Sequence, residues 1–232
     1  MTHPVSGKAL RLGVDIGQKR DPTALAVVEV AARQKDIASL SADRSRASRG
    51  AGSSDGELHY FVRHLERLPL GTPYPEVARR IAQVWRRVKH RAGLPPSLFV
   101  DATGVGAPVV DLLGADPDLA AHLWAVTLTY GNRRTIRAAD RRICLGKEKL
   151  FRYLVFRFDT RCLHLPATSE AKALAAELRS YEIRVDENGT DRYGAFQSGT
   201  HDDLVTALGL AVQEELPAAS VRSRAPWPRR LR

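Results

Sequence analysis

Four aspartates in three separate parts of the chain have the chemistry and the setting to act together. Asp15 lies within an apolar run, Asp101 ends a second run, and Asp202 and Asp203 open a third near the carboxyl end. A carboxylate inside a buried strand is costly unless a partner neutralises it. We therefore expect these acids to converge in space and to be neutralised by divalent cations.

The expected cations are hard ones. Magnesium and manganese prefer oxygen ligands and are often bound by few carboxylates, with water and substrate phosphate completing the shell. Two such ions about 4 Å apart can activate a water molecule and stabilise the leaving oxygen of a phosphodiester. Without metal the aspartates would repel one another, so crowding and cation affinity belong together. The pattern favours two Mg2+ or Mn2+ ions as cofactors.

Each aspartate also has a purely structural interpretation. Asp15 could be satisfied by neighbouring backbone donors, and Asp101 could cap the helix expected after it. Asp202 and Asp203 could interact with the dipole of the last helix, with Thr200 as its N-cap. At about 100° per helix residue, Asp203 falls beside the apolar stripe and Asp202 points away. Asp203 is thus the better candidate to reach inward, with Asp202 at the rim.

The hydrophobic pattern predicts the elements that position these acids. Residues 12–17 and 23–30 flank a polar turn and indicate a β-hairpin, with residues 57–68 as a third adjacent strand. The further predicted elements are a helix 75–93, a strand 97–101, a helix 107–113, a strand 122–129, a basic loop, a helix 147–158, a strand 162–165, a helix 169–178, a hairpin 181–196 and a helix from His201. This is an α/β plan around a mixed sheet, forming one domain over residues 1–216.

The charge distribution favours nucleic acid as the partner. The 232 residues carry 36 Lys and Arg against 26 Asp and Glu, giving a net charge of +10. Arginines crowd one face of the 75–93 helix, the predicted basic loop and the tail 217–232, which we expect to be flexible. In the loop, Arg133, Arg134 and Arg137 are the candidates for DNA contact. Residues 33–56, rich in serine, arginine and glycine, are expected to form a mobile loop.

The cysteines and the hydropathy pattern indicate in which cellular compartment the protein is expected. Cys144 and Cys162 are isolated in the sequence, which favours a reducing compartment and argues against a cysteine-based zinc site. No uninterrupted apolar run has membrane length, and the first residues lack a signal-peptide pattern. We expect a cytoplasmic protein with no membrane partner.

Three segments together resemble the nuclease domain of bacteriophage terminase large subunits. They are Gly-Val-Asp-Ile-Gly at 13–17, Val-Asp-Ala-Thr-Gly-Val-Gly at 100–106 and His-Asp-Asp-Leu-Val-Thr-Ala-Leu at 201–208, the last being the most specific. The similarity runs from about residue 12 to about residue 215. It implies a ribonuclease H-like fold with an extra β-hairpin, and two metal ions that cut double-stranded DNA during viral genome packaging.

The resemblance also assigns residue roles. Asp15, Asp101 and Asp203 would be the metal ligands, and Asp202 would be a fourth catalytic acid. His201 would orient the site or contact a DNA phosphate.

Other positions extend the resemblance. Asp21 is similar to a structural turn residue, Lys147 opens a segment that looks like a late helix of the family and would contact DNA, and the hairpin 181–196 is similar to one near the DNA groove. Terminase large subunits carry an ATPase motor before the nuclease, whereas this chain has no Gly-x-x-x-x-Gly-Lys-[Ser/Thr] phosphate loop. We expect an excised domain or a free-standing relative in the bacterial host cytoplasm, with any packaging ATPase or portal as a separate partner.

Two alternatives stay open at this point. The first is a non-catalytic DNA-binding or assembly module of the same fold. The second is an actin-like or sugar-kinase ATPase domain, whose phosphate-binding strand can also contain Asp-x-Gly. Those ATPases generally need two such domains, for which this chain is short.

Overall fold

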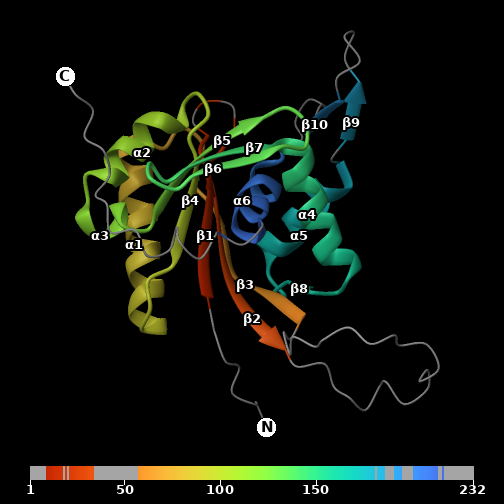
Figure 1. Cartoon of the computed structure of the whole chain (residues 1–232), viewed down its shortest axis with the longest axis horizontal. Helices are drawn as coiled ribbons and strands as arrows, with labels where there is room; N and C mark the ends of the chain where they lie inside the picture. Colours follow the sequence, from red (N-terminus) through yellow and green to blue (C-terminus); the bar gives the residue numbers. More distant parts are fainter. Residues whose placement is uncertain are drawn as a thin grey trace.

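A mixed eight-stranded sheet runs through the centre of the molecule (Figure 1). The computed structural model describes residues 9–17, 19, 21–33, 57–180, 182–185, 191–194, 201–213 and 216. The strands are β1 (Ala9–Asp15), β2 (Ala24–Arg33), β3 (Glu57–Arg67), β4 (Ser97–Asp101), β5 (Leu123–Thr129), β6 (Arg134–Arg137), β7 (Arg142–Gly146), β8 (Leu163–His164), β9 (Glu182–Val185) and β10 (Asp191–Gly194). The sheet order is β6-β7-β5-β4-β1-β2-β3-β8, and β9 and β10 form a separate hairpin.

The pairing directions create one edge where several strands end together. β1 pairs antiparallel with β2, and β2 pairs antiparallel with β3, which confirms the predicted hairpin and its third strand. β1 is parallel to β4, β4 to β5, and β5 to β7. The carboxyl ends of these four strands therefore meet at the same edge of the sheet.

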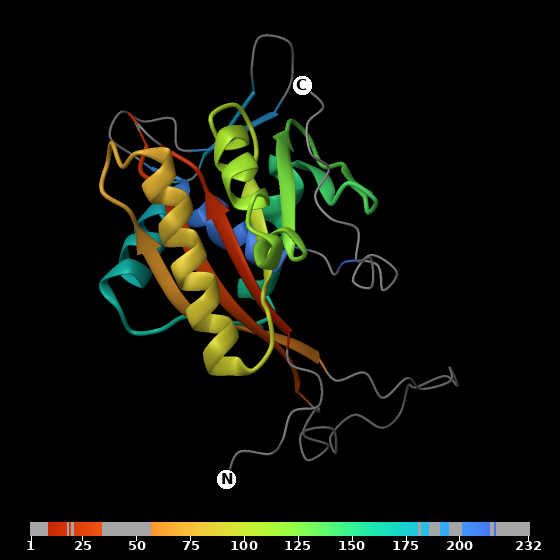
Figure 2. The same cartoon turned by 90° about the vertical axis from the view of Figure 1, so that its left-hand side faces the viewer.

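Helices cover both faces of the sheet. They are α1 (Tyr74–Ala92), α2 (Gly106–Gly114), α3 (Pro117–Ala120), α4 (Lys147–Asp159), α5 (Ser169–Ser180) and α6 (Asp203–Val212). The first three lie on one face, and α4, α5 and α6 lie on the other (Figures 1 and 2). No helix in the described part of the chain is long and apolar enough to cross a bilayer. The architecture is the predicted mixed α/β fold.

Two strands replace the predicted basic loop. Residues 134–137 and 142–146 form β6 and β7, which pair as an antiparallel hairpin at the edge of the sheet. In β7, Ile143 and Leu145 are fully buried while Arg142 and Cys144 are exposed. This period-two alternation is the signature of a half-buried strand, and the surrounding arginines obscured it.

The remaining boundaries differ in detail. The predictions do not include α3, a single turn whose N-cap Asp116 accepts hydrogen bonds from the backbone of Asp118 and Leu119. α6 begins at Asp203 rather than at His201, and β2 continues to Arg33. The predicted mobile loop from residue 34 onward, the expected N-cap Thr200 and the tail 217–232 lie outside the described residues.

α6 is the most enclosed element, lying between the sheet and helices α4 and α5 (Figure 1). All ten of its residues are buried, so the buried surface covers the whole helix and not only the one-sided apolar stripe that the sequence predicted. A Cβ on Gly13 of β1 would lie 2.1 Å from the Ala207 carbonyl oxygen and 2.8 Å from the Ala211 nitrogen. The helix backbone therefore rests directly on β1, and only glycine permits that approach.

Polar contacts fix the carboxyl end of the same helix. The buried Arg11 donates from Nη1 to the Gln213 carbonyl at 2.8 Å and to the Ala211 carbonyl at 3.4 Å. Gln213 donates from Nε2 to the Leu210 carbonyl at 3.0 Å. These donors satisfy carbonyls that have no partner within the helix, and the guanidinium charge complements the helix dipole.

We expect Gly13→Ala to destabilise the fold by about 3 kcal/mol or more, the upper end of the range for overpacking, because the added methyl meets helix backbone that cannot rotate away. Gly71→Ala is the control, since its Cβ meets nothing within 4 Å and only its φ of 84° is unfavourable. That conformational cost is about 1–2 kcal/mol. Urea unfolding measures the free energy of unfolding of both variants. An equal loss for the two would contradict the direct packing of the α6 backbone on Gly13.

Candidate active site

Strand register places Asp15 and Asp101 side by side. β1 and β4 pair in parallel with Val14 opposite Val100, so the aspartate that follows each valine ends its strand at the same edge. Both valines pack into the core on the α1 side of the sheet. Because side chains alternate along a strand, both aspartates face the α6 side.

Asp101 is anchored by the turn that follows it. Its Oδ1 accepts a hydrogen bond from the Thr103 backbone nitrogen at 2.8 Å, and the Thr103 hydroxyl accepts one from the Leu128 nitrogen at 2.9 Å. Burial raises the pKa of the Asp101 carboxyl, whereas the Thr103 hydrogen bonds and the charge of Lys147 oppose the increase. The N-cap of α2 is Val105, so Asp101 does not cap that helix and its contact is with the turn residue Thr103 instead.

Electrostatics show that the four acids share one neighbourhood. Burial raises the pKa of the Asp15 carboxyl well above its ordinary value, and the negative charges of Asp101, Asp202 and Asp203 raise it further. The opposing influence is the ammonium group of Lys147. A carboxylate surrounded by like charge is a site that a cation would stabilise.

Lys147 owes this position to the end of β7. It is the first residue of α4 and directly follows Gly146, whose parallel partner on β5 is Thr129. The lysine therefore lies at the same sheet edge as the acids, and its charge lowers the pKa of both Asp15 and Asp101. Sequence reasoning gave Lys147 only a role in DNA contact.

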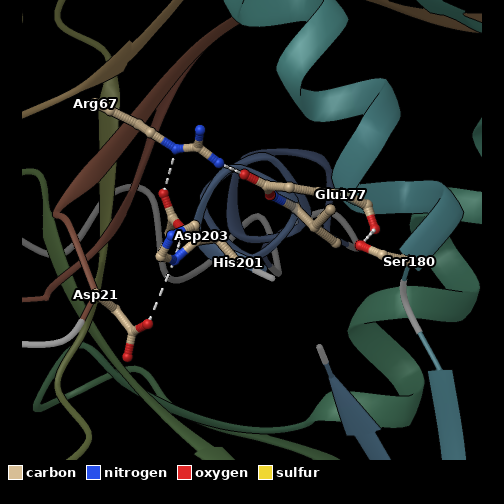
Figure 3. Close-up of polar contacts among 7 residues, drawn as sticks. Asp21, Arg67, Glu177, Ser180, His201 and Asp203 are labelled. Atoms are coloured by element: carbon tan, nitrogen blue, oxygen red, sulfur yellow. Dashed lines mark hydrogen bonds and ion pairs between the residues drawn. The ribbon is translucent and has the colours of Figure 1, made fainter. Parts of the chain in front are cut away.

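Asp203 is held by an ion-pair network that crosses from the sheet to two helices (Figure 3). It is 1% exposed, and its Oδ2 accepts a hydrogen bond from Arg67 Nε of β3 at 2.6 Å. The same guanidinium pairs with Glu177 of α5, which accepts a hydrogen bond from the Val205 nitrogen of α6 at 3.0 Å. One arginine thus neutralises two buried acids and ties α5 to the start of α6.

His201 lies beside the remaining oxygen of Asp203. Its Nδ1 is 3.8 Å from Asp203 Oδ1 and 3.6 Å from Asp21 Oδ1, and Figure 3 shows the ring between the two acids. Both His201 Nδ1 and Asp203 Oδ1 are buried and lack a hydrogen-bond partner among the described residues. Buried polar atoms of this kind are normally satisfied, so a cation or water molecule fits here.

The spacing of the acids limits how an ion can be shared. In the described part of the chain, no three of the four aspartates bring ligand atoms within 4.8 Å of one another. That is too wide for a single ion bound by three of these side chains as they stand. Two cations about 3.5–4 Å apart spread their ligands over a greater width.

The predicted DNA-contact arginines differ in their surroundings. Arg133 is exposed, Arg137 pairs with Asp140 at 2.9 Å, and Arg134 donates to Gln213 Oε1 at 3.2–3.3 Å. Arg134 thereby supports the carboxyl end of α6. The side chains of the β9–β10 hairpin lie outside the described residues.

Sequence reasoning did not include Arg67 or Glu177. Glu177 occupies the buried face of α5, three residues after the buried Leu174 and six after Ala171. An acid on the apolar face of a helix was the available signal that a buried counter-charge exists. Arg67 carried no such signal, because an arginine at a strand end is ordinarily solvated.

Asp15→Asn should stabilise the metal-free protein at neutral pH. Because the folded-state pKa lies above the ordinary value of 3.8, the carboxyl contributes stability below that pH and loses it as pH rises through the folded pKa. The variant's advantage should therefore narrow as pH falls toward 3.8. Thermal unfolding in chelator across this range measures it, with the exposed Asp118→Asn as the control. An unchanged or lower Tm at neutral pH would contradict the electrostatic crowding.

Arg67→Met should cost about 3–5 kcal/mol, because it leaves the Asp203 and Glu177 charges buried without a partner. Arg63→Met on the same strand is the matched control. Arg63 is 54% exposed and pairs with Glu29, so its loss should cost about 0–1 kcal/mol. Urea unfolding compares the two variants, and similar losses would argue against the buried network.

Comparison with solved structures finds this fold in nuclease domains of phage large terminases. The magnesium-bound large terminase nuclease of thermophilic phage G20c matches with a TM-score of 0.55 at 17% identity, covering 89% of this chain and 82% of that one. The cobalt-bound G20c nuclease gives a TM-score of 0.52 at 17% identity, covering 88% and 80%. The Thermus phage P74-26 large terminase nuclease domain gives 0.52 at 16% identity, covering 88% and 78%. No protein-family model and no curated protein sequence matches the chain. The chain has the ribonuclease H-like fold of the phage large terminase nuclease domain.

Proposed function

We propose that this protein is a metal-dependent endonuclease that cleaves double-stranded DNA with two bound cations. The observation that carries the proposal is the cluster of acids at the carboxyl ends of β1 and β4 and the start of α6. Asp101, Asp202 and Asp203 all act electrostatically on Asp15. Nuclease domains of the same fold have been solved with magnesium and with cobalt bound, which supports divalent-cation chemistry in this fold.

The donor set fits Mg2+ or Mn2+. Asp15, Asp101 and Asp203 would hold the ions, and Asp202 would support the site from the rim. When bound, the cations supply Lewis acidity and a nucleophilic water for attack on the phosphodiester. The residues themselves hold the geometry, since Arg67 fixes one oxygen of Asp203 and Thr103 fixes one oxygen of Asp101.

Two basic side chains at the site have roles that follow from their positions. The charge of Lys147 acts to lower the pKa of both Asp15 and Asp101, so it favours their ionised forms, and the ammonium group can contact a scissile phosphate. His201 lies between Asp21 and Asp203, where it can orient the site or donate to a phosphate oxygen.

DNA binding would rest on charge rather than on base contacts. The net charge of +10 and exposed arginines such as Arg133 suit the phosphate backbone. Affinity should therefore fall steeply with salt. A packaging role, with a separate ATPase or portal and a location in the host cytoplasm, belongs to the same proposal.

Asp15→Asn should reduce metal-dependent cleavage of supercoiled plasmid by about 10³-fold or more, because several kcal/mol of metal-dependent stabilisation corresponds to such a factor. DNA binding by gel shift should change little, since basic side chains rather than Asp15 make the phosphate contacts. Asp118→Asn, an exposed acid on α3, is the control and should cleave as the unmodified protein does.

The cleavage assay is run in parallel with manganese, with magnesium and with a chelator. Cleavage that persists in chelator, or in Asp15→Asn with contamination excluded, would overturn the proposal. DNA binding without cutting under any metal would instead identify a non-catalytic module of the same fold.

A further inference from the structure

A second group of metal-binding side chains lies far from the acids, at the opposite end of β3. Glu57, His59 and Cys162 each place one ligand atom within 4.8 Å of the other two, and they are the only such triplet of His, Cys, Asp or Glu in the described part of the chain. Glu57 is the first residue of β3, whereas Arg67 at the other end of the strand contacts Asp203. At 3.3–3.4 Å per residue, roughly 30 Å separates the two groups.

The sheet register explains why these residues meet. β8 pairs in parallel with β3, with Tyr60 opposite Leu163, so the preceding residues His59 and Cys162 are also neighbours. The Tyr60 nitrogen donates to the Cys162 carbonyl at 2.7 Å, which fixes the backbone there. A separation of 103 residues along the chain between His59 and Cys162 hid this pairing from sequence analysis.

The geometry points to a zinc site bound by Cys162 Sγ, a Glu57 carboxylate oxygen and a ring nitrogen of His59. Zinc takes thiolate, imidazole and carboxylate ligands in tetrahedral sites. With bonds of about 2.3 Å to sulfur and 2.1 Å to oxygen, tetrahedral ligands lie roughly 3.6 Å apart. Cys162 Sγ and Glu57 Oε1 are 3.3 Å apart, so this pair needs only a few tenths of an ångström of adjustment, and the His59 nitrogen lies within 4.8 Å of both.

A neighbouring histidine supports the site from behind. His59 Nδ1 and His164 Nε2 share a hydrogen bond of 2.8 Å, and the His59, Phe61 and His164 rings stack. Histidine ligands are commonly oriented by a hydrogen bond from the second ring nitrogen. We assign His164 that positioning role, with a water molecule completing the coordination.

Access and selectivity are also satisfied. Cys162 is 2% exposed, but Glu57 is exposed and His59 is partly exposed, so an ion can enter from the solvent side. A thiolate ligand favours zinc over magnesium or manganese, whereas the acids near Asp15 offer only oxygen. The two sites therefore sort cations by ligand chemistry. The isolation of the two cysteines in the sequence argued against a cysteine-based zinc site; the proposed site departs from that expectation because strand pairing brings Glu57 and His59 to Cys162.

The bound ion would connect the edge strand to the sheet. β8 has only two residues, and it joins α4 to α5. A zinc ion bound by both Cys162 and the first residues of β3 would hold this connection in place. Because the ion would bind only the folded state, it would raise the free energy of unfolding.

Cobalt substitution of the reduced, metal-free full chain tests the proposal. One equivalent of Co2+ should produce a near-ultraviolet thiolate charge-transfer band, and Zn2+ should displace it. The oxygen ligands near Asp15 cannot produce this band, so the readout belongs to a cysteine site. Cys162→Ser should abolish the band, whereas Cys144→Ser, which removes the exposed cysteine of β7, should retain it.

Two further variants address the possibility that Cys162→Ser does not fold. His164→Gln should keep the band but weaken Co2+ affinity by about 10–100-fold. Glu57→Gln, which removes a direct ligand at an exposed position, should also keep the thiolate band and weaken the affinity at least as much. Zinc should also raise the Tm of the unmodified protein and leave that of Cys162→Ser unchanged. Absence of the band in the unmodified protein, or its loss in Cys144→Ser, would overturn the assignment.

Discussion

The direct contact between the α6 backbone and β1 at Gly13 is the constraint on which the rest of the site depends. A Cβ at that position would lie 2.1 Å from the Ala207 carbonyl oxygen, so a residue with a side chain would not allow the helix to lie this close to the strand. β1 ends at Asp15, two residues after Gly13, so this close approach also brings the start of α6 to the end of the strand. Asp203 therefore meets the strand-end acids through helix packing, and Arg11 and Gln213 hold the far end of the helix in register.

Charge balance then divides the four acids by function. Asp203 is buried, and Arg67 pairs with both it and the buried Glu177 of α5, so its charge has a partner within the protein. Among the described residues no arginine pairs with Asp15: burial and three neighbouring acids raise its pKa, and Lys147 opposes them only in part. The uncompensated charge is thus concentrated at Asp15. A cation binding there gains most from neutralising it, while Asp203 keeps one oxygen, Oδ1, turned away from the arginine.

The sequence predicted those features in which local pattern and tertiary structure agree. The β1–β2 hairpin, α1 and the strand ending at Asp101 follow from apolar periodicity and from Pro75 and Gly93 as boundaries. Periodicity failed where charged residues hid a short strand, as in β6 and β7. It could not reveal Arg67 or the Glu57, His59 and Cys162 group, because those contacts depend on strand order, which places β8 next to β3.

β3 connects the two proposed metal sites in a way that ties one to the other. Its first residue is Glu57 and its last is Arg67, and it pairs along its length with β2 through a register shift between Val27 and Val28. A slip of one residue in β3 would turn every side chain to the opposite face and withdraw Arg67 from Asp203. An ion joining Glu57 and His59 to Cys162 would oppose such a slip, since Cys162 is fixed to β3 by its own backbone. The distant zinc site would therefore act on the nuclease site by holding the strand that positions Arg67.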